Sequence, residues 1–459
     1  MKKELLTSEV SLNFNSDVEI SEDQRNLFNI TENTNNNIVI TGGAGVGKSF
    51  IVDYFKKHTM KNVLVLASTG AAAINIKGQT IHSAFRLKPK IQVVDFKNEE
   101  LWKTPNKVKT MIRNADTFLF DEISMTSPDV IDMVDQKCKL VMNSSLAFGG
   151  KQAVFIGDLL QLPPVIKQKS VFDYLVDHYG GTHFFNAPAF KEGDFKIYEL
   201  TEIFRQQDLK FKKMLNDIRV GKVSDEILDK LNSRVGLPIN EEEYIILTAT
   251  NKNADSINQS KLNSIDNEEY TYYANITGDI NENNFSADAE LRLKVGAQVM
   301  LLSNDKKKRW GNGSLGIITQ LYPNEIVVRI GGKEYSIPKF EWHNYKNEYD
   351  EETKKIKQVI TGSLEQFPIK LGWALTIHKS QGKTFKSIFI DLEDGAFASG
   401  QVYVALSRCT SLEHLYLKKK INKSDIKVDK EALKFLKDMK ISNIIEDGKE
   451  VDYSYTISD

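Results

Sequence analysis

Residues 38–49 read IVITGGAGVGKS, a pattern typical of a strand, a turn and the start of a helix. Ile38–Thr41 predicts a short buried strand. The next eight residues match the pattern G-x-x-x-x-G-K-[ST], whose glycines let the backbone wrap phosphate oxygens while the following helix N-terminus adds partial positive charge. Lys48 is expected to reach the β- and γ-phosphates of a nucleotide, and the Ser49 hydroxyl to hold Mg²⁺. The predicted phosphate-binding residues are Gly42, Gly43, Ala44, Gly45, Val46, Gly47, Lys48 and Ser49.

A glycine-rich turn without a ligand is the competing interpretation of this stretch. The strand before it and the helix after it make that interpretation much weaker.

Further apolar runs on the C-terminal side of this motif predict more buried strands. Parallel strands are continuous apolar runs because helices cover both faces of their sheet. The alternation of these runs with helical patterns predicts an α/β fold with two sheet domains in sequence. The runs are Val63–Ala67, Thr117–Phe120 and Ala153–Ile156 in the first series, and Tyr244–Leu247, Ser387–Ile390 and His414–Leu417 in the second.

Two stretches interrupt this alternation and predict insertions. Residues 86–110 contain Pro89, Pro105 and several lysines, and they are too short for a domain. Residues 277–365 carry period-2 runs separated by glycine turns, which favours a small antiparallel barrel. Besides these insertions, we expect a first sheet domain over 1–85 and 111–199, a second over 200–276 and 366–440, and a C-terminal tail over 441–459.

Composition sets broad limits on the kind of protein. The 459 residues suffice for two or more domains, and 41% hydrophobic with 27% charged residues are ordinary values for a globular protein. No apolar run reaches the roughly 20 residues that span a bilayer, and no export signal is recognisable at the N-terminus. With only Cys138 and Cys409, no disulfide framework is expected. A reducing cytoplasm is expected instead, the host cytoplasm if a phage encodes the chain.

The net charge of −1 gives no overall sign of nucleic-acid binding. A protein that slides along a strand needs only a local basic track, and Lys306–Arg309 and Lys418–Lys420 are two basic runs. Each such run is more often a solvated face than a binding patch.

Two adjacent acids directly follow the predicted strand Thr117–Phe120. At the carboxyl end of a strand, Asp121 is placed to hold a metal ion, often through water, and Glu122 to orient and deprotonate an attacking water. A solvated loop is the competing interpretation and would be preferred for an isolated pair. The neighbouring phosphate loop favours the metal site.

The strand Ala153–Ile156 is followed by Gly157–Pro164, GDLLQLPP, and here a family resemblance becomes specific. The stretch resembles the third motif of superfamily 1 helicases of the RecD-like and Pif-type branch, closest to the phage Dda-type DNA helicases. The resemblance implies two tandem RecA-like domains with a pin-like insertion in the first and an SH3-like β-barrel insertion in the second. It also implies that Gln161 senses the γ-phosphate and links it to the bound strand.

Other motifs of that family follow in its order, and the resemblance covers residues 21 to 415. Ala67–Ala73 and Thr80–Phe85 resemble motifs that line the groove for a single strand, and Thr376–Gly382 resembles a third. Hydroxyl groups suit phosphate contacts, and aromatic rings suit base stacking. By this resemblance the strand-binding residues are Ser68, Thr69, Thr80, His82, Phe85, Trp373, Thr376 and His378.

The two aromatic residues in this set have competing interpretations. Phe85 taken alone is more often a core residue. Trp373 fits stacking on a base and filling the core equally well. Trp102, within the first insertion, is the candidate for an aromatic at the tip of a pin.

Two arginines resemble the arginine fingers of the family. Arg205 lies in Glu202–Gln206, and Arg408 ends Val402–Arg408. An arginine delivered across a cleft stabilises charge on the transferred phosphate and is worth about 10³–10⁵ in rate. Arg205 by itself also fits a surface side chain, whereas Arg408 stands in a complete motif.

Gln24 has two interpretations that concern different bonds. Ser21–Gln24 fits a capping box, in which the Gln24 side chain bonds back to the Ser21 amide. By resemblance, a glutamine at this distance before the phosphate loop reads adenine.

Taken together, these residues imply an ATP- and Mg²⁺-dependent 5′-to-3′ helicase on single-stranded and forked duplex DNA. The resemblance further implies a functional monomer that works beside a single-strand binding protein or other replication proteins. An RNA helicase, or a translocase that displaces proteins, has the same chemistry and stays open. An ATP-gated strand-binding or loading module is disfavoured, because a passive binder needs neither Gln161 nor fingers across a closing cleft.

Overall fold

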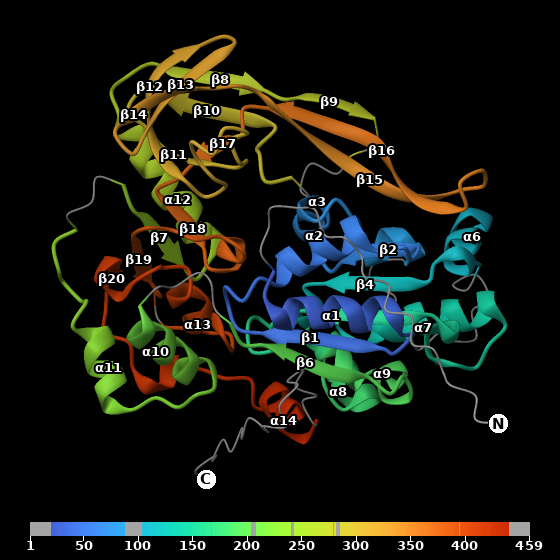
Figure 1. Cartoon of the computed structure of the whole chain (residues 1–459). Helices are drawn as coiled ribbons and strands as arrows, with labels where there is room; N and C mark the ends of the chain where they lie inside the picture. Colours follow the sequence, from blue (N-terminus) through green and yellow to red (C-terminus); the bar gives the residue numbers. More distant parts are fainter. Residues whose placement is uncertain are drawn as a thin grey trace, which may run out of the picture.

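The computed structural model describes residues 20–87, 103–166, 168–202, 208–239, 243–278, 280, 285–393 and 395–439. Figure 1 shows two α/β domains beside one another and an antiparallel region that lies across both of them. The α/β class and its two parallel sheets, predicted from the apolar runs, are confirmed.

The first sheet is parallel, and its strands run in the order β3-β2-β4-β5-β1-β6. The carboxyl ends of parallel strands meet at one edge, which is where ligands bind in such folds. The strands are β1 (Ile38–Gly42), β2 (Val63–Ala67), β3 (Gln79–Thr80), β4 (Thr117–Asp121), β5 (Gln152–Ile156) and β6 (Lys196–Leu200).

Helices cover both faces of this sheet because its strands are apolar on both sides. Leu27 of α1 and Phe55 of α2 pack on one face, and Ile112 of α6 and Ile131 of α7 on the other. The helices are α1 (Glu22–Asn33), α2 (Lys48–His58), α3 (Gly70–Asn75), α4 (Ile81–Phe85), α6 (Asn106–Asn114), α7 (Pro128–Met142), α8 (Lys169–Tyr179) and α9 (Pro188–Glu192).

The second sheet is also parallel, in the order β18-β7-β19-β20. Its core contains Phe211 and Ile218 from α10 and Val404 from α13. The strands are β7 (Ile245–Thr248), β18 (Ala374–Thr376), β19 (Ile388–Asp391) and β20 (Leu415–Leu417). The helices of this part are α10 (Leu209–Arg219), α11 (Asp225–Asn232), α12 (Asn251–Asn263) and α13 (Gln401–Leu406).

The antiparallel region has a compact part and a long arm. In the compact part, a five-stranded sheet shares a core with the strand pair β8 and β10. Its strands are β8 (Glu269–Tyr273), β10 (Glu290–Lys294), β11 (Gln298–Leu301), β12 (Leu315–Tyr322), β13 (Glu325–Ile330), β14 (Lys333–Ile337) and β17 (Ile369–Leu371).

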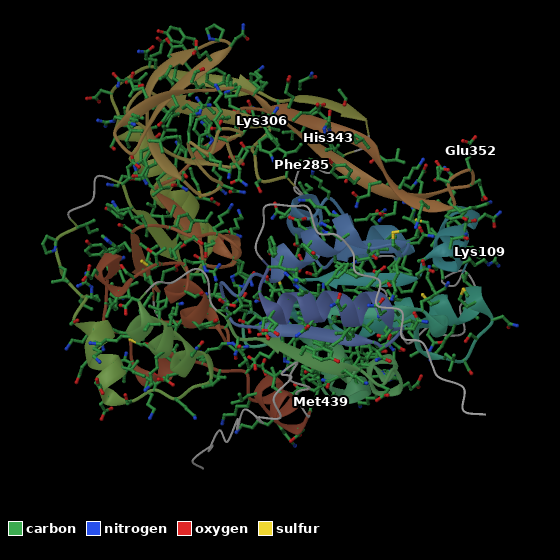
Figure 2. The ribbon with its side chains drawn as sticks, in the orientation of Figure 1. Lys109, Phe285, Lys306, His343, Glu352 and Met439 are labelled. Carbon is green, nitrogen blue, oxygen red and sulfur yellow. The ribbon has the colours of Figure 1, made fainter. Side chains whose placement is uncertain are left out.

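The arm is a hairpin of β15 (Phe340–Asp350) and β16 (Lys355–Gln366), extended by β9 (Asn275–Gly278). It reaches over the first domain and ends above α6. Figure 2 shows Glu352 at the tip of the arm and Lys109 on the helix below. A barrel was predicted at this place, and no arm.

Two predicted boundaries differ from the structure. The antiparallel region is wider than residues 277–365, since β8 precedes that range and β17 follows it. The chain after β20 returns to the first domain, where α14 (Lys430–Asp438) packs Leu433 and Leu436 into its core. Of the predicted first insertion, residues 88–102 lie outside the described residues.

Short 3₁₀ turns complete the described structure: Ile123–Met125, Ala147–Gly150, Phe184–Asn186, His378–Ser380, Leu412–His414 and Lys423–Asp425. Across the described residues, none of the helices combines the length and the apolar character that crossing a membrane requires.

Candidate functional site

The predicted phosphate loop joins the end of β1 to the start of α2. Gly45 and Gly47 have φ angles of 84° and 83°, a left-handed conformation that side chains disfavour. The Lys48 Nζ donates hydrogen bonds to the carbonyl oxygens of Gly42 and Gly43, at 2.8 and 2.9 Å. The lysine therefore lies over the loop, and the loop with the helix N-terminus forms a cradle that fits nucleotide phosphates.

Asp121 and Glu122 stand beside this cradle at the end of β4. Burial, reinforced by Glu122, raises the pKa of Asp121 to about 7, although Lys48 opposes the shift. Burial also raises the pKa of Glu122, against the opposing charges of Lys48 and Arg408. Glu122 has a φ of 51°, which is uncommon for a residue with a side chain and is typical of functional turns.

The chemistry of these donors fits a magnesium ion. Asp121 offers carboxylate oxygens and Ser49, at the start of α2, offers a hydroxyl oxygen, and hard oxygen donors are the ligands that Mg²⁺ prefers. A cation next to Asp121 would also favour the charged form of this buried carboxyl group.

Arg408 approaches the acids from the second domain. It lies close enough to Glu122 for its charge to lower the pKa of that group, so the structure brings together the residues predicted on the two walls of the cleft. Its side chain is 1% exposed. Its guanidinium donates to the carbonyl oxygens of Val404, Ser380 and Lys383. Arg408 therefore also holds the turn after β18 against α13, a structural role that the motif did not indicate.

Gln161 lies where the two domains touch. It is buried, and its Oε1 accepts a hydrogen bond from Nε2 of Gln381, in the second domain, at 3.3 Å. Gly400, at the start of α13, approaches so closely that a Cβ there would lie 2.4 Å from the Gln161 carbonyl oxygen. The predicted sensor thus contacts both domains.

Two residues at this junction were missed by the sequence analysis. Arg219, at the end of α10, donates to Asp158 at 3.0 and 3.2 Å and to Glu199 at 3.0 Å. The Tyr403 hydroxyl accepts the Ala44 amide of the phosphate loop at 2.8 Å and faces Asp158 at 3.5 Å. No spacing in the sequence links these positions.

The predicted strand-contacting hydroxyls of the first domain lie at the carboxyl ends of β2 and β3. Thr69 and Thr80 cap helices, accepting the amides of Ala72 and Ser83. The Ser68 hydroxyl is buried and has no hydrogen-bond partner within the described part of the chain. His82 is partly exposed, and burial lowers its pKa. These groups share the sheet edge with the phosphate cradle, at the β2 and β3 side.

The prediction that Phe85 stacks on a base is wrong. Its side chain is 0% exposed and lies in the core of the first domain, edge-on to Phe118 at 5.8 Å. The hydroxyl-rich start of α4 reaches the surface, whereas the end of this short helix turns inward.

In the second domain, Thr376 is buried and its Oγ1 accepts the Lys379 amide. Trp373 is partly buried and packs against the core of the antiparallel region, which favours the packing interpretation. His378 lies nearly parallel to Phe397, with ring centroids 6.4 Å apart. Phe397 is 60% exposed, and no sequence motif indicated it.

The remaining predicted residues have separate outcomes. Ser21 and Gln24 form the expected capping box, so the Gln24 Oε1 accepts the Ser21 amide, and contact with adenine stays a prediction. Arg205 and Trp102 lie outside the described residues.

Part of each basic run has a local partner. Arg309 pairs with Asp305 and stacks on Trp310, and Lys418 pairs with Asp391. This agrees with the solvated-face interpretation.

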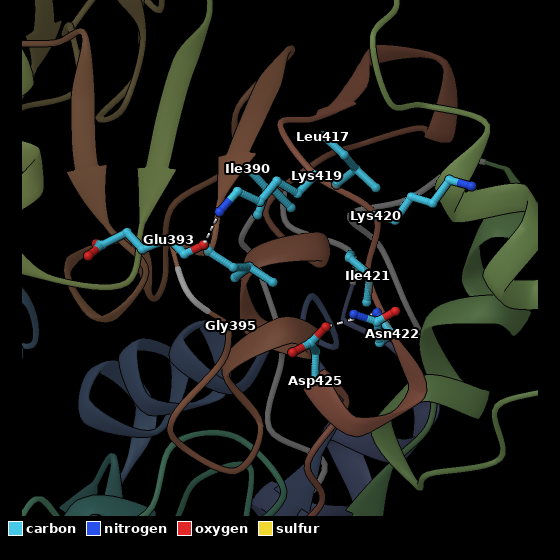
Figure 3. Close-up of a pocket in the computed structure, with 10 residues that line it drawn as sticks. Ile390, Glu393, Gly395, Leu417, Lys419, Lys420, Ile421, Asn422 and Asp425 are labelled. Carbon is cyan, nitrogen blue, oxygen red and sulfur yellow. Dashed lines mark hydrogen bonds between the residues drawn. The ribbon is translucent and has the colours of Figure 1, made fainter.

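A cavity of about 260 Å³ lies beside β19 and β20 (Figure 3). Lysines and acids line it together, and Lys419 donates to the Glu393 carbonyl oxygen there. Among the residues that line it, none belongs to the predicted site.

Comparisons with known proteins give a consistent result. The family model for PIF1-like helicases matches residues 19–228, and the model for the 2B domain of DNA helicase Pif1 matches residues 278–321. The chain is 32% identical to the ATP-dependent DNA helicase Pif1 of Campylobacter jejuni, over 87% of this chain and 94% of that protein.

Two solved structures of Bacteroides Pif1 are similar at 36% identity, over 92% of this chain and 97% of theirs. The complex with ADP-AlF4 has a TM-score of 0.85, and the complex with single-stranded DNA has a TM-score of 0.64.

Proposed function

Since this chain belongs to the PIF1-like helicase family, we propose that it is an ATP-dependent DNA helicase acting on single-stranded DNA and forked duplexes. The Pif-type part of the predicted resemblance is confirmed by these relatives. The observation that carries the proposal is the approach of Arg408, from the other sheet domain, to Glu122 beside Lys48, where both positive charges act on the Glu122 carboxyl group.

The residues of the cleft have different roles in ATP hydrolysis. The phosphate loop and Lys48 bind the phosphates, and Glu122 takes the proton of the attacking water. Charge that builds on the transferred phosphate is stabilised by Arg408, which arrives from the second wall. Arg205 is proposed as a second finger, and Gln24 as the residue that contacts adenine.

Ser49 and Asp121 are proposed to hold Mg²⁺. When bound, the ion supplies positive charge beside the phosphates. Asp121, at the end of β4, would hold the ion, and Glu122 would activate the attacking water.

The strand is proposed to cross the carboxyl edges of both sheets, past Ser68, Thr69, Thr80 and His82 and then Thr376 and His378, with movement in the 5′-to-3′ direction. A change in cleft closure also changes the distance between the two strand-binding walls. Gln161 touches both domains and is therefore placed to link the nucleotide to this change. We further propose a cytoplasmic monomer that works with a single-strand binding protein. The two buried free cysteines support a reducing compartment.

ATPase and unwinding assays on partial duplexes test this proposal. Substrates should carry a 5′ tail, a 3′ tail or no tail, with RNA versions as separate arms. Strand-stimulated turnover and unwinding of the 5′-tailed DNA alone are the expected result. Preference for a 3′ tail would overturn the polarity, and preference for RNA would favour the RNA helicase. Stimulated hydrolysis without strand separation would favour the protein-displacing translocase.

A further inference from the structure

A buried polar group joins the two sheet domains beside the phosphate loop. In the first domain, Asp158 follows β5 and Glu199 lies in β6. In the second domain, Arg219 ends α10 and Tyr403 lies in α13. The side chains of Asp158, Arg219 and Glu199 are 0%, 7% and 10% exposed. Charges this deeply buried are found paired, and here the pairing crosses the domain boundary.

Arg219 uses its guanidinium as a fork between two carboxylates. Its Nε and Nη2 donate to one oxygen of Asp158, and its Nη1 donates to Glu199. Burial alone would lower the pKa of Arg219, but the two carboxylates raise it above its usual value. The planar fork suits this double contact, which a lysine cannot make.

Asp158 in turn shapes the turn that carries the predicted sensor. The oxygen that accepts from Arg219 also accepts the Leu160 amide at 3.2 Å, and the Asp158 carbonyl accepts the Gln161 amide at 3.1 Å. Such a side-chain bond to the backbone two residues on defines a tight turn. The orientation of Gln161 therefore depends on where the Asp158 carboxylate is held.

We propose that Arg219 is a positioning residue of the motor: from the second domain it holds the Asp158 carboxylate and so orients the turn that carries Gln161. This inference rests on the proposed function. Tyr403 adds a second link, because its hydroxyl bonds the Ala44 amide of the phosphate loop and faces the same carboxylate. Gln161 is thus correctly oriented only while the second domain touches the first.

A buried ion pair by itself is weak evidence for stability, so the test must separate positioning from packing. Arg219→Met removes the fork and keeps much of the volume. Lys139→Met is the matched control: it also removes the cation beside a buried carboxylate, since Lys139 pairs with Asp135 at 2.8 Å on α7, away from the cleft. Turnover on saturating single-stranded DNA gives kcat and the KM for ATP. Binding to a fluorescent single strand with and without a non-hydrolysable ATP analogue gives the nucleotide-dependent change in affinity.

Arg219→Met is expected to lower kcat with little change in the KM for ATP, because the phosphate loop remains intact. The change in strand affinity on adding the analogue should largely disappear, a loss of about 5- to 150-fold as is usual for coupling between sites. Arg219→Lys should recover thermal stability better than kcat. Asp158→Asn should show the same kcat defect, and the double variant little more than either single one. Lys139→Met should keep both the wild-type kcat and the wild-type change in strand affinity.

A purely structural role predicts another result. If Arg219→Met melts at a lower temperature but keeps the wild-type kcat and nucleotide-dependent affinity, the proposal is overturned. Should Arg219→Met not fold, Asp158→Asn decides alone, and wild-type values there overturn it as well. A wild-type protein without strand-stimulated turnover would instead overturn the proposed function, and this role with it.

Discussion

The second half of the chain meets the first domain at two junctions of opposite character. At the nucleotide cleft the contacts are buried and charged, as between Arg219 and Asp158. Where the arm rests on the first domain, several polar contacts are exposed. The Lys107–Glu348 ion pair, for example, is 77% and 36% exposed, and Asn62 bonds the Lys354 carbonyl oxygen at the surface. A buried contact at this seam joins the Gln79 Oε1 to the Asn347 backbone and side-chain amides.

This difference indicates which junction is tied to chemistry. Breaking a buried pair leaves an uncompensated charge and costs about 3–5 kcal/mol, whereas an exposed pair is worth about 0–1 kcal/mol. The cleft should therefore hold one defined geometry, and the seam should tolerate change. The following predictions test that contrast.

Glu122→Gln should have the largest effect, because it removes the base at the centre of the cleft. The amide keeps the shape but cannot take the proton of water, so turnover should fall by about 10²–10⁴-fold. ATP and strand should still bind. Single-turnover hydrolysis together with equilibrium binding checks this result. Intact turnover per bound ATP would show that Glu122 is not the base.

Arg408→Ala should lower turnover at saturating ATP and strand by at least about 100-fold. The structure adds that three carbonyl oxygens lose a donor, so a lower melting temperature is also expected. Arg408→Lys serves as the control, since a point charge should restore little of the rate. If Arg408→Ala retained its turnover, the second domain would have no catalytic role, and the contrast between the cleft and the arm seam would fail.

A pair of phenylalanines sharpens the contrast between buried and exposed positions. Phe85→Leu should destabilise the fold by about 1–3 kcal/mol, because the ring lies in the core, and should leave strand affinity unchanged. Phe397→Leu should weaken single-strand affinity by about 1–3 kcal/mol and leave the melting temperature nearly unchanged, if the exposed ring beside His378 stacks on a base. Thermal melts and strand titrations of both variants decide. If Phe85→Leu weakened strand affinity and Phe397→Leu lowered the melting temperature, Phe85 would be the residue that stacks on a base.

Lys107→Ala at the arm seam should have the smallest effect, a change of about 0–1 kcal/mol that weakens further at high salt. Strand-independent hydrolysis should stay at its wild-type level. Thermal melts at two salt concentrations give the measurement. If Lys107→Ala lost as much thermal stability as Arg219→Met, the seam and the cleft would be equally rigid.

Much of the fold and of the nucleotide site followed from local patterns. The strands at Ile38, Val63, Thr117 and Gln152 begin within one residue of their predicted positions, since buried parallel strands are continuous apolar runs. The arm was not predicted, because exposed or partly exposed residues occupy most of its length, and apolar residues such as Val359 and Ile360 are among them.

What the sequence determined by itself is chemistry contained in one strand, turn and helix. In Gly42–Ser49 the spacing of glycines and lysine suffices, because the loop closes on its own backbone, and the Ser21–Gln24 cap spans a single helical turn. Only the tertiary structure decided which ring is buried and which arginine meets which acid. The pairs Arg219–Asp158 and Tyr403–Ala44 are separated by 61 and 359 positions, so no local spacing encodes them. They exist because two cores bring their surfaces together and leave no water to solvate the charges between them.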